Sequence, residues 1–199
     1  LQNPTTDSWD AVKRLGRYLV GVPRLVQRFP RQPPQSVVVA FSDSDHAGCV
    51  KTRKSTTGVA LFHGSHMLKF SSHPQTVVST STGEAEWYAC VKAASALIGL
   101  RSLGADLGRK FSMLMRVDAT AAQGIAARRG VGQVKHLAVS TLWLQQWTTS
   151  KEMKIKKVDS GENVADLGTK HLEAKIPQHL LKLLGFHVQE GRVEAPKAY

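Results

Sequence analysis

The sequence contains only two cysteines, Cys49 and Cys90, and no pair spaced as Cys-x-x-Cys. Two isolated cysteines make neither a disulfide framework nor a zinc-binding set, so we expect free thiols in a reducing compartment. The longest purely apolar run, Val37 to Phe41, is too short to cross a bilayer. The sequence also shows no secretory signal and no initiating Met, and we expect the chain to be a piece of a longer protein.

The sequence lacks a P-loop, a G-x-G-x-x-G fingerprint and a G-x-S-x-G motif, which argues against common nucleotide-binding and serine-hydrolase sites. Acidic residues are scarce, because 15 Asp and Glu stand against 27 Lys and Arg, for a net charge of +12 in 199 residues. The basic residues are spread along the chain, which is typical of a folded basic surface. This charge favours a polyanionic partner, above all a nucleic acid, over a simple role in solubility.

The hydrophobic pattern predicts an N-terminal preamble followed by elements in the order β-β-β-α-β-α-α-β-α. The preamble holds a short helix, Trp9 to Leu19, which Gly21 and Pro23 end. Strands are expected at residues 37–42, 57–63, 66–71, 111–117 and 153–158. Helices are expected from Thr80–Thr82 toward Gly104, at residues 119–128 and 134–147, around Asp166, and from about residue 174. This order predicts a mixed α/β sheet covered by helices.

The long helix that begins near Thr82 carries one carboxylate on its apolar side. At about 100° per residue, Glu86 falls on the side of Cys90 and Leu97, whereas Glu84 falls with Ser95 on the polar side. A carboxylate at the edge of a core is costly unless something pairs with it. Glu86 is therefore the stronger functional candidate of the two.

Three further carboxylates follow predicted strands. Asp43 ends the first strand, Asp118 ends the fourth, and Asp166 lies just beyond the fifth. If these strands are neighbours, the three acids and Glu86 meet at one edge of the sheet and raise one another's pKa. Mg²⁺, which Mn²⁺ can replace, prefers oxygen ligands and offsets such charge. Two ions roughly 3.5–4 Å apart would suit an in-line phosphodiester displacement, so we expect a two-ion site.

Each of these acids also has a plainer interpretation. Asp43 in Ser-Asp-Ser-Asp is typical of a turn, Asp118 could cap the next helix, and Asp166 could be an exposed helix acid. Only their joint order favours a metal site. His63 and His66 resemble a zinc-binding pair, but they fit a surface hairpin better because no cysteine or second pair accompanies them.

Several short segments occur in a characteristic order: Ser42–Gly48, Arg53–Gly58, Lys69–Ser72 with Gln75, Ser81–Ala89, Val117–Asp118 with Ala122, Lys135–Leu137 and Val164–Lys170. Together they resemble the ribonuclease H domain of copia-type LTR retrotransposon Pol polyproteins. The resemblance implies a ribonuclease H-like mixed five-stranded sheet, with three antiparallel strands and then parallel strands, flanked by helices. It also implies that residues 1–34 are the C-terminal tail of a reverse transcriptase and a linker, residues 35–172 the ribonuclease H-like domain, and residues 173–199 a C-terminal helix and tail.

By the same resemblance, the chain is expected to be a two-metal ribonuclease H that hydrolyses the RNA strand of RNA–DNA hybrids during reverse transcription. The family's four catalytic and metal-binding acids correspond to Asp43, Glu86, Asp118 and Asp166. The expected partners are the hybrid and the reverse transcriptase domain of the same polyprotein, without a membrane or a small-molecule cofactor. The expected location is a cytoplasmic retroelement particle or the nucleus.

Two alternatives stay open beside this activity. The first is a weakly active or inactive module that has the same fold and binds nucleic acid. The second is a DNA strand transferase of the integrase type, but such enzymes place Glu last among three acids, whereas Glu86 comes second here. The loop at residues 159–163 also lacks the His that cellular ribonucleases H carry before the last Asp. The resemblance therefore leaves open how the product leaves and what protonates the leaving group.

Nucleic-acid contacts are expected from polar and basic side chains near the acids. Hydroxyl and amide groups can read the 2′-hydroxyls of a hybrid, and basic groups can contact phosphates. The expected set comprises Ser72, Gln75, Ser81, Thr82, Arg53, Lys54, Lys69, Lys135 and His136. Turn formation and helix capping remain alternatives for the hydroxyl and amide groups, and simple solvation remains an alternative for the basic ones.

Overall fold

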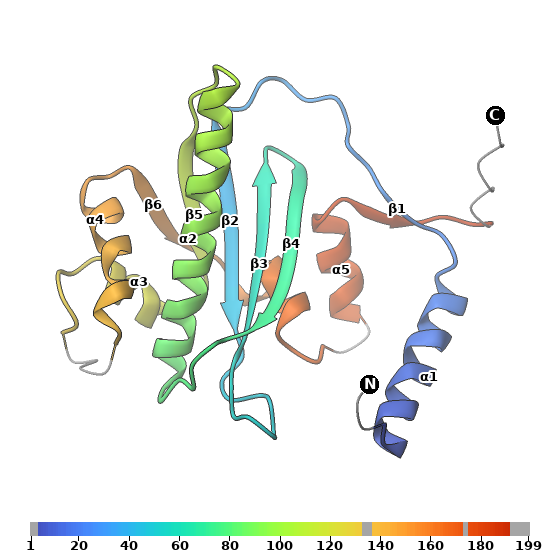
Figure 1. Cartoon of the computed structure of the whole chain (residues 1–199). Helices are drawn as coiled ribbons and strands as arrows, with labels where there is room; N and C mark the ends of the chain where they lie inside the picture. The colour runs from blue at the N-terminus through green and yellow to red at the C-terminus, as the bar shows by residue number, and fades with distance from the viewer. Residues whose placement is uncertain (1–3, 133–136, 173–174, 192–199) are drawn as a thin grey trace. The chain divides into compact units, whose positions relative to one another are not determined.

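The computed structural model describes residues 4–132, 137–172 and 175–191 (Figure 1). The chain divides into two compact units, Phe29–Gly185 and a smaller unit of Leu1–Arg28 with Phe186–Tyr199. Both cysteines are free thiols, as predicted. Among the helices of the described part, none combines the length and the apolar character that a membrane crossing requires.

The larger unit is built on a five-stranded sheet with the order β4-β3-β2-β5-β6. Its strands are β2 (Val37–Ser44), β3 (Thr56–His63), β4 (His66–Pro74), β5 (Ser112–Val117) and β6 (Met153–Lys157). Strand β3 runs antiparallel to β2 and β4, whereas β5 runs parallel to β2 and β6. The prediction of a ribonuclease H-like mixed sheet, antiparallel and then parallel, is confirmed.

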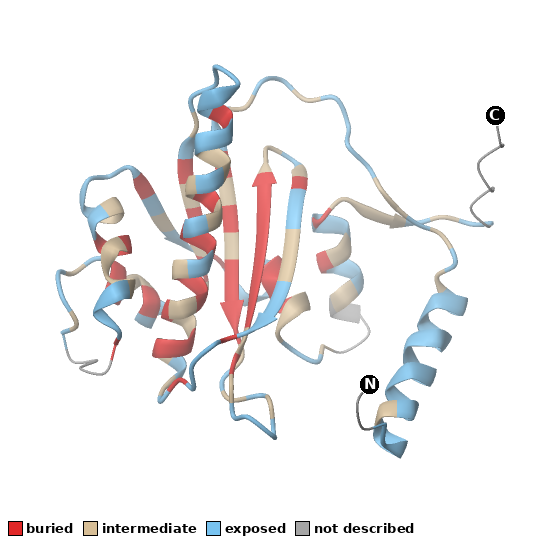
Figure 2. Ribbon diagram, in the orientation of Figure 1, coloured by how far each residue is buried: buried red, intermediate tan, exposed pale blue. Residues whose placement is uncertain are grey.

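Helix α2 (Thr82–Asp106) lies against β2, β3 and β5 and closes the core on that side of the sheet. Figure 2 shows buried residues concentrated on β2, β3 and α2. The helix begins where predicted, because the Ser81 hydroxyl caps it by accepting a hydrogen bond from the Glu84 amide. The predicted polar position of Glu84 is wrong. Its buried carboxylate accepts hydrogen bonds from the Thr80 amide and the Tyr88 hydroxyl, which helical phase alone does not reveal.

The helices that follow β5 along the chain are all shorter than α2. They are α3 (Thr120–Ala126), the 3₁₀ helices η1 (Val139–Thr141), η2 (Ser160–Glu162) and η3 (Val164–Gly168), and the helices α4 (Trp143–Thr149) and α5 (Lys175–Leu183). The predicted continuous helix over residues 134–147 is wrong in its described part, where the α-helix begins only at Trp143. The Thr141 hydroxyl donates to the Ala138 carbonyl and accepts from the Trp87 indole, and this turn competes with a helix.

The smaller unit contains α1 (Thr6–Gly21) and two short strands, β1 (Leu25–Gln27) and β7 (Phe186–Val188), which pair antiparallel. Helix α1 begins earlier than predicted because the Thr5 hydroxyl accepts a hydrogen bond from the Ser8 amide. The strands β1 and β7 were not predicted. Three residues are too few to show an alternating pattern, and their partners lie at opposite ends of the chain.

Candidate metal centre

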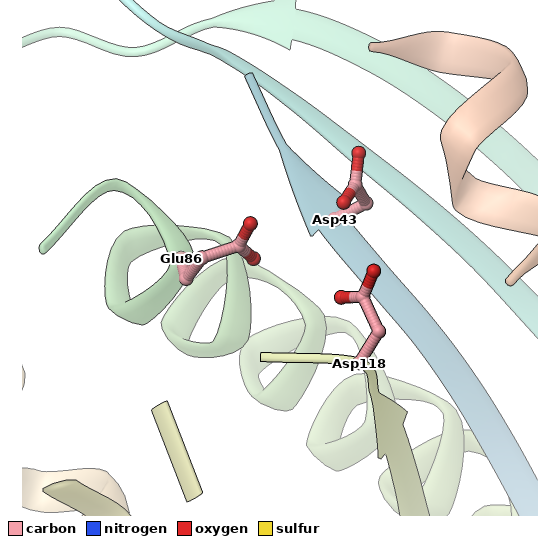
Figure 3. Close-up of side chains that lie close together, drawn as sticks. All are labelled: Asp43, Glu86 and Asp118. Atoms are coloured by element: carbon pink, nitrogen blue, oxygen red, sulfur yellow. The ribbon is translucent and has the colours of Figure 1, made fainter. Parts of the chain in front are cut away.

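Three carboxylates from separate elements meet at the carboxyl ends of β2 and β5. Asp43 lies near the end of β2, Asp118 directly follows β5, and Glu86 lies near the start of α2. Because β2 and β5 are parallel neighbours, their carboxyl ends reach the same edge of the sheet. Figure 3 shows the three side chains pointing toward one another, and one carboxylate oxygen of each lies within 4.8 Å of the others.

The plainer interpretations of these acids do not describe what the structure shows. Asp43 is fully buried and belongs to the strand, which continues through Ser44. Asp118 does not cap α3, because the N-cap residue of this helix is Ala119 and no side chain caps it. The Glu86 Oε2 and Asp118 Oδ1 atoms are buried and find no hydrogen-bond partner among the described residues. Buried carboxylate oxygens without partners are costly, so this donor set fits a bound divalent cation.

The 3₁₀ helix η3 brings the fourth predicted acid, Asp166, to the same edge. The buried Asn163 side chain donates to the Ser42 carbonyl at 3.2 Å and accepts from the Ala165 amide at 3.3 Å, which ties η3 to the end of β2. On β3, Gly58 leaves room for η3, because a Cβ there would lie 2.5 Å from the Ala165 carbonyl oxygen. The position of Asp166 therefore depends on close packing between distant segments.

Lys170 joins Asp166 to the other acids. Its Nζ atom lies 3.0 Å from Asp43 Oδ1, 3.0 Å from Asp166 Oδ1 and 3.9 Å from Asp118 Oδ2. The adjacent Thr169 hydroxyl donates to the second oxygen of Asp43. Burial lowers the pKa of Lys170, but hydrogen bonds and charges from Asp43 and Asp166 outweigh that effect and raise it. Lys170 is therefore a charged ammonium at neutral pH.

Three acids of the centre, Glu86, Asp166 and Asp43, have a pKa raised above that of an isolated acid. Burial raises the pKa of Glu86 to about 8, and the charges of Asp43 and Asp118 add to the effect. Burial and the charge of Asp43 raise the pKa of Asp166 to about 6. Burial also raises the pKa of Asp43. The cluster is therefore short of positive charge near neutral pH, and a divalent ion would release a proton from Glu86 on binding.

The predicted nucleic-acid contacts differ in exposure. Arg53, Lys69, Ser72 and Thr82 are exposed, and Lys54 and Ser81 are half-buried. Ser72 lies beside η3, where its hydroxyl donates to the Gly168 carbonyl at 2.5 Å. The predicted contacts from Lys135 and His136 lie outside the described residues. The nucleic-acid role of all these residues stays a prediction.

Gln75 lies inside the protein. Its side-chain amide donates to the Thr57 hydroxyl at 3.0 Å and to the Ala85 carbonyl at 2.9 Å, and its oxygen accepts from the Ser79 hydroxyl. These bonds tie the loop before α2 to β3 and to the first turn of the helix. The structure therefore gives Gln75 a positioning role in the segment that presents Glu86, instead of a place on an exposed surface.

Sequence reasoning missed three residues that shape the centre: Asn163, Thr169 and Lys170. The last two lie within the segment Val164–Lys170, whose acid Asp166 was identified. A signal for Lys170 was present, because a lysine four residues after an acid can reach it on a helix. Nothing local indicates that the lysine also reaches Asp43, which lies 127 positions earlier.

The chain has relatives among the Pol polyproteins of plant transposons. It is 28% identical over 189 residues to the retrovirus-related Pol polyprotein from transposon TNT 1-94 of Nicotiana tabacum. It is 29% identical over 185 residues to that from transposon RE2 of Arabidopsis thaliana. These matches cover 94% and 92% of this chain but only 14% and 13% of the polyproteins. No protein-family model matches the sequence.

Similar solved structures include ribonuclease H domains. The N-terminal RNase H domain of a Mycobacterium tuberculosis protein, solved as a fusion with maltose-binding protein, is 14% identical with a TM-score of 0.49 and covers 74% of this chain and 98% of that chain. Prototype foamy virus protease-reverse transcriptase is 14% identical with a TM-score of 0.48 and covers 81% of this chain and 22% of that chain. Because these TM-scores are below 0.5, the fold assignment rests on the order and directions of the strands. The strand order and directions match the predicted ribonuclease H-like sheet, and over most of its length the chain is similar to a part of the retrovirus-related Pol polyproteins of plant transposons, as the predicted resemblance requires.

Proposed function

We propose that this domain is a metal-dependent endonuclease that hydrolyses the RNA strand of RNA–DNA hybrids. The observation that carries the proposal is the meeting of Asp43, Glu86 and Asp118, whose ligand oxygens lie within 4.8 Å of one another. Two buried oxygens of this group, on Glu86 and Asp118, have no hydrogen-bond partner in the described part of the chain. An all-oxygen donor set of this charge suits Mg²⁺ or Mn²⁺.

Asp43, Glu86, Asp118 and Asp166 would hold the ions. Bound divalent ions supply the positive charge that activates a water nucleophile and stabilises the leaving 3′-oxygen of a phosphodiester. The protein holds Asp43 in place by burial, so this carboxylate need not reorganise when substrate arrives. Glu86, with its raised pKa, carries a proton in the ion-free centre and gives it up when positive charge enters.

The substrate class is inferred from charge, from nearby hydroxyl groups and from the relatives. A net charge of +12 favours binding to the phosphate backbone of a nucleic acid. The exposed side chains of Ser72 and Thr82 lie on segments next to the centre, where hydroxyl groups can contact the 2′-hydroxyls of an RNA strand. In the Pol polyprotein context, the proposed partner is a reverse transcriptase of the same polyprotein, to which residues 1–34 would belong. The proposed location is a retroelement particle.

A cleavage assay tests this function. Labelled RNA–DNA hybrid, duplex RNA and duplex DNA are incubated with the protein, with and without Mg²⁺. Only the RNA strand of the hybrid should be cut, and only with the ion. Asp43→Asn and Glu86→Gln should each lower the rate by about 100-fold or more. The exposed acid Asp159, changed to Asn, is the matched control and should leave the rate unchanged.

The assay also separates the nuclease from a binding module. Hybrid binding without cutting, in the unchanged protein with Mg²⁺ present, would support the weakly active or inactive nucleic-acid-binding module instead. Equal cutting by the unchanged protein and by Asp43→Asn would remove the acidic centre from the reaction.

A further inference from the structure

Lys170 divides the acidic centre into two unequal halves. On one side, Asp43, Glu86 and Asp118 face one another, and among the described residues Glu86 Oε2 and Asp118 Oδ1 have no hydrogen-bond partner, while the Lys170 ammonium lies 3.9 Å from Asp118 Oδ2. On the other side, the Lys170 ammonium lies between Asp43 and Asp166, at 3.0 Å from an oxygen of each. One half therefore contains carboxylate oxygens without partners, and the other half already contains a cation.

The place of Lys170 is determined by the local backbone. The Lys170 and Thr169 amides donate to the Asp166 carbonyl at 3.0 and 3.2 Å, which makes a turn after η3 and directs both side chains toward Asp43. The two carboxylates that hold the ammonium are buried, with side-chain exposures of 0% for Asp43 and 8% for Asp166, while Lys170 is 38% exposed. The lysine thus reaches into the centre from its solvent side and can leave it without disturbing the core.

We propose that Lys170 competes with one of the two divalent ions that the proposed nuclease would use. An ion can enter the half formed by Asp43, Glu86 and Asp118 without displacing the lysine. An ion shared by Asp43 and Asp166 needs the oxygens that the ammonium holds, so it must displace Lys170. This inference rests on the proposed function only in taking the four acids as ion ligands.

The balance of charge points the same way. Four ionised carboxylates carry a charge of −4, which two divalent ions neutralise completely. With the ammonium retained, two ions would give an excess of positive charge within a few ångströms, where repulsion is strong. One ion together with Lys170 leaves a modest negative charge. The two ions should therefore bind with clearly different affinities. At low concentrations of divalent ion, the centre should contain one ion, with the Lys170 ammonium between Asp43 and Asp166.

The test is a titration of the whole chain with Mn²⁺, in which the EPR signal of free Mn²⁺ reports the number and affinity of bound ions. The unchanged protein should bind one ion tightly and a second weakly. Lys170→Met should tighten the second ion by at least about tenfold and alter the first much less. Lys154→Met, which removes the same charge from an exposed position on β6, is the matched control and should leave both affinities near those of the unchanged protein.

Two further measurements keep the test decisive if Lys170→Met is unstable. Lys170→Arg retains the charge and should retain a weak second ion. In the absence of Mn²⁺, Lys170→Met should unfold at a lower temperature than the unchanged protein, because Asp43 and Asp166 lose their counter-charge. Added Mn²⁺ should reduce that difference, because a ligand stabilises the folded state by mass action. A purely structural lysine would leave the difference unchanged.

The outcomes distinguish this inference from the proposed function. Two ions with the same affinities in the unchanged protein and in Lys170→Met would overturn the competition but leave a metal-dependent nuclease in place. Equal tightening by Lys154→Met would overturn it as well, because the effect would then belong to net charge. Failure of the unchanged protein to bind any Mn²⁺ would overturn both proposals.

Discussion

The two sides of the acidic centre are built from different kinds of structure. Asp43, Asp118 and Glu86 come from β2, the end of β5 and the long helix α2, which pack on one another through the core. Asp166 and Lys170 come from a five-residue 3₁₀ helix and the turn after it, which are held by a few specific contacts. The first side depends on the core, and the second depends on contacts that single substitutions can remove.

The largest expected effect is a difference in the rate of hybrid hydrolysis between a substitution on one side of the centre and a substitution on the other. Asp118→Asn removes a ligand on the side built from regular elements, and we expect hydrolysis of a hybrid to fall by about 100-fold or more. Asp166→Asn should lower hydrolysis less at high Mg²⁺, because Asp43 remains as a ligand on that side and Lys170 loses one of the two carboxylates that hold it against an ion. The rates of both variants are measured across a range of Mg²⁺ concentrations. Equal losses at every concentration would mean that the two sides do not differ in function.

A second substitution should displace η3 without altering the other side. A Cβ at Gly58 would lie 2.5 Å from the Ala165 carbonyl oxygen and 3.0 Å from a Thr169 methyl group. We therefore expect Gly58→Ala to cost roughly 1–3 kcal/mol of stability and to lower hydrolysis strongly. Tight binding of the first Mn²⁺ should persist, because Asp43, Glu86 and Asp118 belong to β2, to α2 and to the end of β5 and not to η3.

The control for Gly58→Ala is Gly99→Ala in the middle of α2. A Cβ at Gly99 meets nothing within 4 Å, so this change should stabilise the protein by roughly 0.5–1 kcal/mol. Thermal unfolding and the Mn²⁺ titration are measured for both variants. Loss of the first ion in Gly58→Ala would show that the two sides of the centre are not independent.

The same division separates what the sequence could predict from what it could not. The meeting of Asp43, Asp118 and Glu86 could be anticipated, because alternation defines strands, helical phase places Glu86, and parallel neighbours end at one edge. Lys170 could not be placed, since its contact with Asp43 depends on η3 lying against Gly58. Tertiary contacts of this kind leave no periodic pattern in the sequence.

The errors in secondary structure have the same physical origin. The expected helix over residues 134–147 begins only at Trp143, because the Thr141 hydroxyl donates to the nearby Ala138 carbonyl and accepts a hydrogen bond from the Trp87 indole. Glu84 is buried because the loop residue Thr80 folds back over it, although its helical phase indicated the polar side. In each case a side-chain contact with another segment prevails over a local propensity.

The pH dependence of the free energy of unfolding should show how much it costs to ionise the carboxyl group of Glu86 in the folded protein without a bound cation. Because the pKa of Glu86 is raised from 4.5 to about 8 in the folded state, the folded protein binds a proton that the unfolded chain has lost across that range. Without divalent ions, the contribution of this group to stability should therefore be highest below about pH 4.5 and should fall as pH rises toward 8, by at most about 5 kcal/mol in total. Denaturant unfolding at several pH values measures this fall.

Glu86→Gln is the variant that assigns the fall to this carboxyl group. In this variant, the free energy of unfolding should fall less between pH 6 and 8 than in the unchanged protein. The exposed control Asp159→Asn should show the same fall as the unchanged protein. Added Mg²⁺ should also flatten the decline in the unchanged protein, because the ion stabilises the ionised carboxylate. A decline of the same size in Glu86→Gln would assign it to another group.

The smallest effects should come from the exposed basic residues Arg53 and Lys69. Arg53 and Lys69 are exposed and form no ion pair among the described residues, so each is free to contact a phosphate. Arg53→Ala and Lys69→Ala should each weaken hybrid binding only a few-fold and reduce the slope of log K against log salt by about 1. Fluorescence anisotropy at several salt concentrations measures both quantities. Because we expect these residues to contact backbone phosphates instead of the scissile bond, the cleavage rate at saturating hybrid should stay close to that of the unchanged protein. A lower rate at saturation would place them in the chemistry of the centre and would extend that centre beyond its two acidic sides.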